Sequence, residues 1–305
     1  MKEYNIEKFR GIFPAFYACY GEDGQISERL VKTMAGYLLE RGANGLYLNG
    51  STGEFILLTV EERKLVTKWV MEEVGGQMTI IDHTAAASTA DSVELARWAG
   101  ECGVDAIASI APLYYPAKPA TIKRYWQEQI AAAGIPFIVY NIPNSGNMVS
   151  KDLWLEMLED ERFVGIKNTT QTLLDMRILK NMLGENRVLF NGPDELLLAG
   201  LMMGADSGIG STYSVLIDFY VAMYKLARAD KWTQAQKIQT FISNLILELI
   251  PFDGTITASM KTLMGMQGIP LHGIRAPLAA NSSADLAKLP AIHARIMAAR
   301  EELLG

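Results

Sequence analysis

Eight short apolar segments recur along the chain, and each is followed by turn residues and then by a stretch with helical periodicity. The segments cover residues 11–16, 45–48, 79–82, 106–110, 137–140, 163–167, 188–191 and 207–210. Successive segments begin roughly 20 to 35 residues apart, which leaves room for one helix between each pair. This alternation is typical of an α/β protein built on a parallel sheet.

Eight β/α units predict a (β/α)8 TIM barrel, which we expect to occupy residues 1–228. The remaining residues 229–305 contain only helical patterns, so they predict a C-terminal helical extension. The length of 305 residues suits one barrel of roughly 250 residues plus an extension, although two domains would also fit. The sequence contains neither a domain linker nor a repeat beyond the β/α period.

The segments between the expected strands have amphipathic helical patterns and recognisable starts. Ser27 is a candidate N-cap, and Thr59 with Glu62 has the spacing of a capping box. The expected barrel helices cover residues 27–39, a helix opening at 59, 88–102, 120–133, 151–158, 172–183 and 216–229. Those of the extension cover residues 232–250, 258–266 and 283–304.

Composition narrows the possible partners. Half of the residues are hydrophobic and the net charge is -6, which argues against a nucleic-acid partner.

Residues 1–10 carry no apolar signal core, and the chain has no apolar run of about 18 residues, so neither a leader nor a membrane span is expected. Cys19 and Cys102 have no metal-ligand spacing, and they fit buried thiols in a reducing cytoplasm.

Residues 163–169 lead a buried strand directly into Lys167. A lysine in a core is costly unless it is paired or neutral, and burial favours the neutral amine, which is a nucleophile. Taken alone, this segment favours an ordinary lysine on a surface strand. In a barrel, however, the active site lies at the carboxyl ends of the strands, where Lys167 is expected.

Two other strand ends carry Ser-Thr pairs beside glycine. Ser51 and Thr52 follow the second strand between two glycines, and Ser211 and Thr212 follow Gly210 after the eighth strand. Glycine lets a ligand approach the backbone N–H groups, and the hydroxyls add donors, so both loops suit a carboxylate or phosphate. The alternative is an ordinary glycine turn.

Tyrosines and carboxylates follow three further strands. Tyr114 and Tyr140 come at the ends of the fourth and fifth strands and can either move protons or pack with a solvated hydroxyl. Asp194 and Glu195 follow the seventh strand, where they can accept hydrogen bonds from sugar hydroxyls or cap the next helix.

The sequence offers no signature of a metal or a nucleotide cofactor. His83, His272 and His293 do not cluster with carboxylates at metal-ligand spacing, and a structural role is favoured for His83. No GxGxxG motif follows a strand, and no P-loop is present. A lysine, a tyrosine and hydroxyl-rich anion loops together favour Schiff-base chemistry on a small α-keto acid.

The chain resembles, over nearly its whole length, the N-acetylneuraminate lyase and dihydrodipicolinate synthase superfamily of class I aldolase-like barrels. The resemblance rests on GSTGE at 50–54, YNIP at 140–143, GIK at 165–167 and GADSGIGS at 204–211. It implies that Lys167 forms a Schiff base with pyruvate, that Tyr140 carries protons and that Ser51 and Thr52 bind the pyruvate carboxylate. It also implies that Tyr114 joins the proton relay, from the same or a neighbouring subunit of a homotetramer.

The resemblance also implies which residues lie near the sugar part of the substrate. They are Thr169, Gly192, Asp194, Glu195, Gly210 and Ser211.

Within the superfamily the sequence is most similar to the sialic acid lyases. This implies cleavage of N-acetylneuraminate to N-acetylmannosamine and pyruvate, without a cofactor. Asn144 and Ser145 stand where the synthases usually carry an arginine for an amino-acid carboxylate. The alternatives are another pyruvate-dependent aldolase, a sugar-acid dehydratase or a dihydrodipicolinate synthase-like enzyme. A barrel that binds keto acids without turnover is a further alternative, against which Lys167 and Tyr140 argue.

Overall fold

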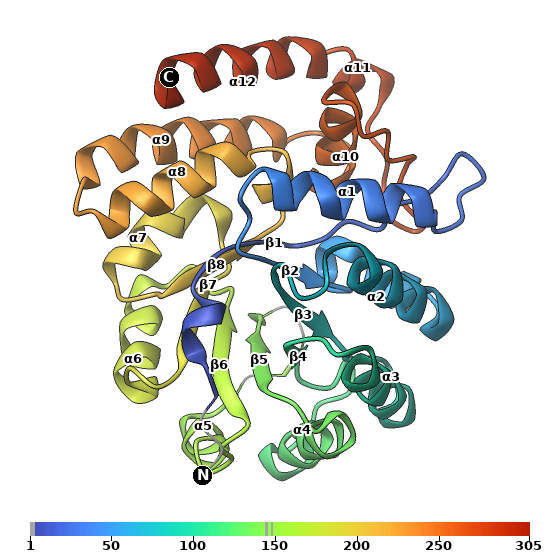
Figure 1. The fold of residues 1–305 in the computed structure, drawn as a ribbon, viewed down its shortest axis with the longest axis vertical. Helices are drawn as coiled ribbons and strands as arrows, with labels where there is room; N and C mark the ends of the chain where they lie inside the picture. The colour runs from blue at the N-terminus through green and yellow to red at the C-terminus, as the bar shows by residue number, and fades with distance from the viewer. Residues whose placement is uncertain (1–3, 144–145, 148) are drawn as a thin grey trace.

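The computed structural model describes residues 4–143, 146–147 and 149–305, and its centre is a closed parallel barrel (Figure 1). The eight strands are hydrogen-bonded in the order β1-β8-β7-β6-β5-β4-β3-β2, and the bridge between Ala15 and Tyr47 joins β1 to β2. The strands are β1 Gly11–Pro14, β2 Gly45–Leu48, β3 Thr79–His83, β4 Ala106–Ser109, β5 Phe137–Asn141, β6 Phe163–Asn168, β7 Val188–Asn191 and β8 Ser207–Gly210. The predicted (β/α)8 TIM barrel is confirmed.

Helices surround the barrel on the outside (Figure 1). They are α1 Glu28–Glu40, α2 Val60–Val74, α3 Thr89–Cys102, α4 Pro119–Ala133, α5 Lys151–Met157, α6 Leu173–Leu183, α7 Leu197–Met202 and α8 Ile217–Arg228. The predicted caps are present, because Ser27 accepts the Leu30 N–H and Thr59 forms a reciprocal capping box with Glu62.

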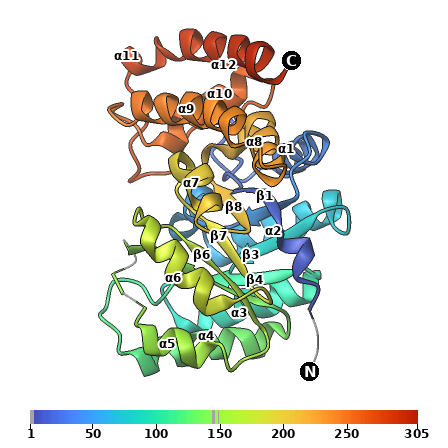
Figure 2. The same cartoon turned by 90° about the vertical axis from the view of Figure 1, so that its left-hand side faces the viewer.

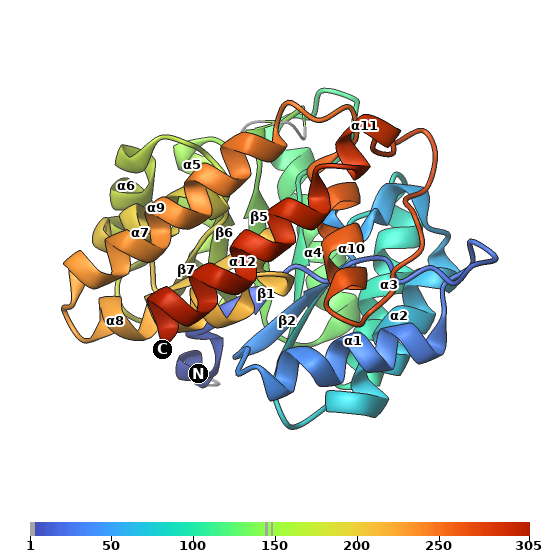
Figure 3. The ribbon, with the colours of Figure 1, turned by 90° about the horizontal axis from the view of Figure 1, so that it is seen from above.

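Four helices follow the barrel and stack on one side of it (Figure 2). They are α9 Trp232–Leu249, α10 Ile256–Met266, α11 Ser283–Leu286 and α12 Leu289–Leu304. Helix α10 packs against α12, and Gln267 at its end accepts a hydrogen bond from Tyr37 of α1 (Figure 3). The predicted helical extension is therefore present, whereas the exact division into domains 1–228 and 229–305 stays a prediction.

The helix boundaries differ from the sequence expectation by more than one residue at three places. The helix that Asp194 and Glu195 were expected to cap begins only at Leu197, as the short helix α7, because residues 194–196 form a 3₁₀ turn first. Helix α10 begins at Ile256, two residues earlier than expected, because Thr255 caps it. The single helix expected over 283–304 is divided into α11 and α12, because Pro290 occupies the first turn of α12, where its missing N–H is tolerated.

The alternation of side chains along each strand produces two apolar layers. In β1, Ile12 packs outward with the helices while Phe13 packs inside the barrel. The inner cluster also includes Phe190, whose ring meets Phe13 edge to face at 5.5 Å between centroids. This packed interior is a rigid base for the side chains at the carboxyl ends of the strands. None of the helices in the described ranges is long and apolar enough to cross a membrane.

Candidate active site

A pocket of about 250 Å³ opens at the carboxyl ends of the strands. The loops after β2, β6, β7 and β8 contribute to its wall, as does the start of α10. It is lined by Ser51, Thr52, Tyr140, Lys167, Thr169, Gly192, Asp194, Ile209, Gly210, Ser211, Ile256 and Thr257. Most of the residues predicted from the strand ends are therefore brought together here.

Lys167 lies in this pocket with only 6% of its surface exposed. Its Nζ lies 3.9 Å from the centroid of the Tyr140 ring and 4.5 Å from that of Tyr47. Within the described part of the chain, Nζ makes these ring contacts but no hydrogen bond or ion pair. The amine is thus enclosed by aromatic faces without a carboxylate bound to it, which suits a nucleophile.

The hydroxyl loop after β2 begins with Asn49, a residue with φ of 52°. Its buried amide donates to Asp82 Oδ1 at 2.8 Å and to Thr67 Oγ1 at 3.0 Å. Asparagine tolerates the left-handed conformation better than most residues, and its amide anchors the loop to β3 and α2. Ser51 and Thr52 follow in a short 3₁₀ turn at the mouth of the pocket.

Asp194 organises the opposite side of the pocket. Its Oδ2 accepts hydrogen bonds from the backbone N–H and the hydroxyl of Thr212, both at 2.6 Å. The backbone N–H of Ser211 donates to Oδ1 at 3.3 Å. Burial raises the pKa of Asp194 to about 6, although the Thr212 hydrogen bonds oppose this change. The carboxylate therefore holds the loop after β8 against the loop after β7.

Thr169 presents an unused polar atom beside the pocket. Its Oγ1 is buried and has no hydrogen-bond partner among the described residues, although its backbone N–H donates to Asn141 O at 2.9 Å. A side chain at Gly192 would overlap this oxygen, and one at Gly210 would overlap Asp194 and Tyr213. Both glycines therefore keep space open around polar groups that a ligand hydroxyl can reach.

Two predicted site residues do not line the pocket of this single chain. Tyr114 is 85% exposed, with φ of 68°, and its ring packs edge to face against Tyr115. Glu195 is partly buried, and its backbone carbonyl accepts from Ser243 Oγ at 3.0 Å. Asn144 and Ser145, on which the argument against a synthase depends, lie outside the described residues.

His83 lies at the end of β3 in the packed interior behind the pocket. It is fully buried, and its Nδ1 lies 2.9 Å from Asn49 O. Burial, with smaller contributions from the charges of Arg63 and Lys167, lowers its pKa well below the ordinary value. A neutral ring packed edge to face against Phe55 and Tyr140 is consistent with the structural role expected for it. In the described ranges, no group of three or more His, Cys, Asp or Glu is placed to hold a metal ion.

Three pocket residues were missed by the sequence analysis. Ile209 belongs to β8, and Ile256 and Thr257 come from the first turn of α10, in the C-terminal extension. The cap residue Thr255 is a local signal for the start of a helix, but nothing in the sequence indicates that this helix reaches the carboxyl ends of the strands. Only the packing of the extension on the barrel places Ile256 and Thr257 there.

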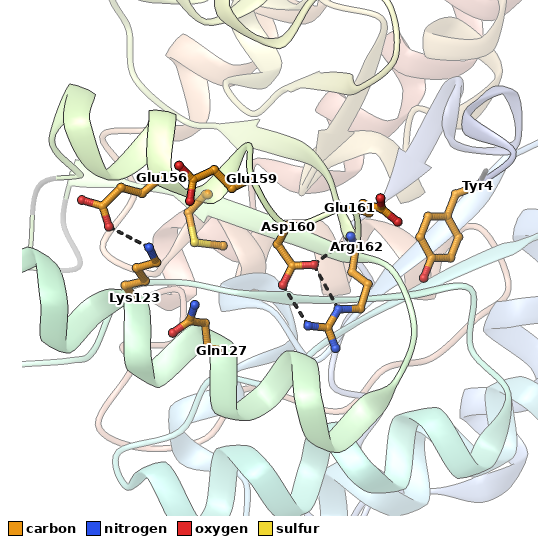
Figure 4. Close-up of a pocket in the computed structure, with 9 residues that line it drawn as sticks. Tyr4, Lys123, Gln127, Glu156, Glu159, Asp160, Glu161 and Arg162 are labelled. Carbon is orange, nitrogen blue, oxygen red and sulfur yellow. Dashed lines mark hydrogen bonds and ion pairs between the residues drawn. The ribbon is translucent and has the colours of Figure 1, made fainter. Parts of the chain in front are cut away.

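A larger hollow, of about 570 Å³, lies at the amino end of β6 (Figure 4). Its charges are largely paired with one another, since Lys123 lies 2.8 Å from Glu156 and Arg162 lies 2.9 Å from Asp160. In this fold the amino-terminal face contributes to stability, whereas chemistry takes place at the opposite face. The smaller pocket around Lys167 is therefore the candidate active site.

The fold and the pocket define an enzyme of the aldolase type, a lyase on a (β/α)8 barrel. The chain belongs to the Dihydrodipicolinate synthetase family, whose sequence model matches residues 8–296. It is 38% identical to the N-acetylneuraminate lyase of Mediterraneibacter gnavus over 285 residues, which are 92% of this chain and 90% of the relative. It is 30% identical to the N-acetylneuraminate lyase of Rhizobium meliloti over 294 residues, which are 96% and 97% of the two chains.

A solved structure is similar over the same range of the chain. The catalytic lysine mutant of the Ruminococcus gnavus sialic acid aldolase has a TM-score of 0.96 to this chain at 36% identity. The match covers 98% of this chain and 99% of that one. The similarity thus includes the C-terminal helices as well as the barrel.

Proposed function

We propose that the protein is a Schiff-base aldolase that cleaves N-acetylneuraminate to N-acetylmannosamine and pyruvate. The observation that carries the proposal is the buried Lys167 amine, enclosed by aromatic rings in a pocket with hydroxyls and a carboxylate around its wall. The relatives named sialic acid aldolases or lyases support this choice of substrate.

The chemistry begins at Lys167. Its amine, in the unprotonated form, attacks the C2 ketone of the open-chain substrate, and uptake of one proton from solution with loss of water gives a protonated imine. Tyr140 accepts the proton of the C4 hydroxyl while the C3–C4 bond breaks, and the electron pair moves to the imine nitrogen to give an enamine. The sugar aldehyde leaves, Tyr140 returns its proton to C3, and water hydrolyses the protonated imine to release pyruvate, the free amine and one proton.

The pocket wall supplies the binding groups for the rest of the substrate. Ser51 and Thr52 are assigned to the carboxylate, because their hydroxyls and the glycine-flanked backbone suit an anion. Thr169, Asp194 and Ser211 are assigned to the sugar hydroxyls, since a ligand hydroxyl would satisfy the unpaired Thr169 Oγ1. Gly192 and Gly210 leave room for the carbon chain of the sugar that bears these hydroxyls. Glu195 is retained as a further sugar contact.

Trapping with borohydride tests the Schiff base directly. The protein is incubated with pyruvate, reduced and digested, and the reduced pyruvyl adduct is expected on Lys167. Lys167→Ala should lose both the adduct and turnover, whereas the exposed control Lys151→Ala should keep both. An adduct-free wild-type protein would exclude the whole aldolase class.

A substrate panel tests the sugar acid separately. Pyruvate release is followed in a coupled assay with N-acetylneuraminate beside deoxy-keto acids of the gluconate type. Preference for N-acetylneuraminate is expected. A chain that forms the adduct yet prefers another acid would support the alternative of a different pyruvate-dependent aldolase, dehydratase or synthase-like enzyme.

The assembly that we propose is a homotetramer located in the cytoplasm. Large apolar side chains are exposed on the neighbouring helices α6, α7 and α9, at Leu174, Ile178, Met202 and Leu247. Such a patch is typical of a surface that another subunit covers. Light scattering during size-exclusion chromatography measures the mass, and a monomer at micromolar concentration would refute the tetramer.

The free thiols of Cys19 and Cys102 fit a reducing compartment.

A further inference from the structure

A buried ion pair joins the hydroxyl loop after β2 to the C-terminal extension. Glu54 and Lys261 are 3% and 1% exposed, and the Nζ of Lys261 donates to Oε1 of Glu54. They are separated by 207 residues in the sequence. Taking two charges out of water is expensive, and neither residue lines the pocket, so the reaction proposed above does not use them directly.

The Glu54 carboxylate is held at both of its oxygens. In addition to Lys261, Oε2 accepts from the Tyr20 hydroxyl at 3.1 Å and from the Arg275 backbone N–H at 2.8 Å. The ammonium of Lys261 also donates to Gly273 O at 3.1 Å. The extension thus holds this side chain through α10 and through the segment that follows α10.

The position of Glu54 is coupled to the hydroxyls of the loop. It directly follows the 3₁₀ turn Ser51–Gly53, and its backbone N–H donates to Ser51 O at 3.1 Å. Its φ of 56° lies in the left-handed region, which is unfavourable for a glutamate unless surrounding contacts hold it. The contacts of the side chain with the extension therefore help to fix where Ser51 and Thr52 lie.

The same helix also reaches the pocket. Thr257, in the first turn of α10, lines the pocket, and Lys261 lies four residues later. Residues four apart lie on one face of a helix, so a shift of α10 would move both side chains together. The ion pair consequently connects the wall formed by α10 to the hydroxyl loop across the mouth of the pocket.

We propose that Lys261 is a positioning residue whose ion pair with Glu54 sets the distance between the Ser51–Thr52 loop and Lys167. This inference rests on the proposed function, in which that loop binds the carboxylate of an α-keto acid. Loss of the pair is expected to weaken keto-acid binding much more than it slows the chemical step, because neither charge contacts the reacting atoms.

The test uses a double variant, Glu54→Gln with Lys261→Met, which removes both charges together and leaves no buried charge unpaired. The pyruvate concentration that half-saturates borohydride trapping is expected to rise about 10- to 100-fold, as a misplaced binding group predicts. The KM for pyruvate release should rise by a similar factor, while kcat stays within about threefold.

A second variant keeps the test sound if the double variant does not fold. Tyr20→Phe removes a single hydrogen bond to Glu54 and leaves the charges paired, so it should raise the half-saturating pyruvate concentration about 2- to 10-fold. The matched control is Lys180→Met with Asp206→Asn. It removes another buried ion pair, in which Lys180 Nζ lies 3.1 Å from Asp206 Oδ1. Asp206 directly precedes β8, so this pair lies at the end of the barrel opposite to the pocket. The control should leave the half-saturating pyruvate concentration unchanged.

The possible results separate the two proposals. A wild-type chain without a lysine adduct would overturn the proposed function and this inference with it. A wild-type adduct with unchanged half-saturation in the folded double variant and in Tyr20→Phe would overturn the inference alone. An equal shift in the Lys180 and Asp206 control would also overturn it, because the effect would then reflect general loss of stability.

Discussion

The Nζ of Lys167 lies 3.9 Å from the centroid of the Tyr140 ring, and the two residues are register partners on β6 and β5. Their proximity is set by backbone pairing inside a packed barrel, not by a flexible loop. A nucleophilic amine and a phenol that are fixed side by side can act on adjacent atoms of one substrate. The division of labour proposed for them follows from this arrangement.

Tyr140→Phe should separate imine formation from bond cleavage. The phenyl ring keeps the contact with Lys167, so trapping of pyruvate should persist, while loss of the hydroxyl should lower kcat about 10²- to 10⁴-fold. Steady-state kinetics and borohydride trapping on the same preparation measure the two steps. The control is Tyr224→Phe on α8, which removes a hydroxyl that donates to Asp206 O. Full activity in Tyr140→Phe would contradict the role in proton transfer assigned to Tyr140.

Asn49 is expected to stabilise the fold in two ways that substitutions can distinguish. Asn49→Gly keeps the left-handed backbone accessible but loses the hydrogen bonds to Asp82 and Thr67, at a cost of about 1–3 kcal/mol. Asn49→Ala loses the same bonds and adds about 1–2 kcal/mol of backbone strain. Urea denaturation measures both variants, and equal stability of the two would show that the conformation carries no strain.

The positions at the strand ends were predictable because the barrel fold determines where they meet. Ser51, Tyr140 and Lys167 each follow an apolar segment, and in a closed parallel barrel the carboxyl ends of all strands share one face. The strands themselves were predicted closely, since short apolar runs between turn residues have few other interpretations. In contrast, the helix after β7 starts later than the carboxylates at 194 and 195 indicate, because residues 194–196 form a 3₁₀ turn before α7.

Contacts distant in sequence could not be predicted. Thr257 reaches the pocket only because α10 packs over the barrel. The ion pair of Glu54 with Lys261 joins two segments, and the local sequence of neither indicates a contact with the other. Tyr114 is exposed in the single chain, so the role proposed for it requires the proposed assembly of subunits. Tertiary packing therefore accounts for the part of the site that the sequence did not indicate.

Asp194 should give the protein a measurable dependence of stability on pH. Burial raises its pKa from the ordinary 3.8 to about 6, so between these values the folded state holds a proton that the unfolded state releases. The free energy of unfolding should thus fall by about 3 kcal/mol in total as pH rises from about 4 to 6. Above about pH 6 this loss of stability, which comes from ionising the buried Asp194, is fully present.

Asp194→Asn does not titrate and should lose this component. Unfolding free energies of wild type and variant, measured by denaturant at several values between about pH 4 and pH 7, give the difference between their slopes. Other carboxyls titrate equally in both proteins and cancel in that difference. Parallel curves for the two proteins would show that Asp194 ionises in the folded state as it does in the unfolded chain.

Tyr114 provides a test of whether catalysis depends on assembly. Its ring is 85% exposed in the single chain, and its φ of 68° is unusual for a bulky residue, so the conformation presents the phenol outward at a conformational cost. If this phenol joins a proton relay of a neighbouring subunit, Tyr114→Phe should lower kcat about 10- to 100-fold without changing the mass of the assembly. Tyr115→Phe is a matched control, because its ring is 75% exposed and lies 5.0 Å from that of Tyr114. Kinetics and light scattering on both variants decide the question, and equal kcat values in the two would restrict Tyr114 to packing between subunits.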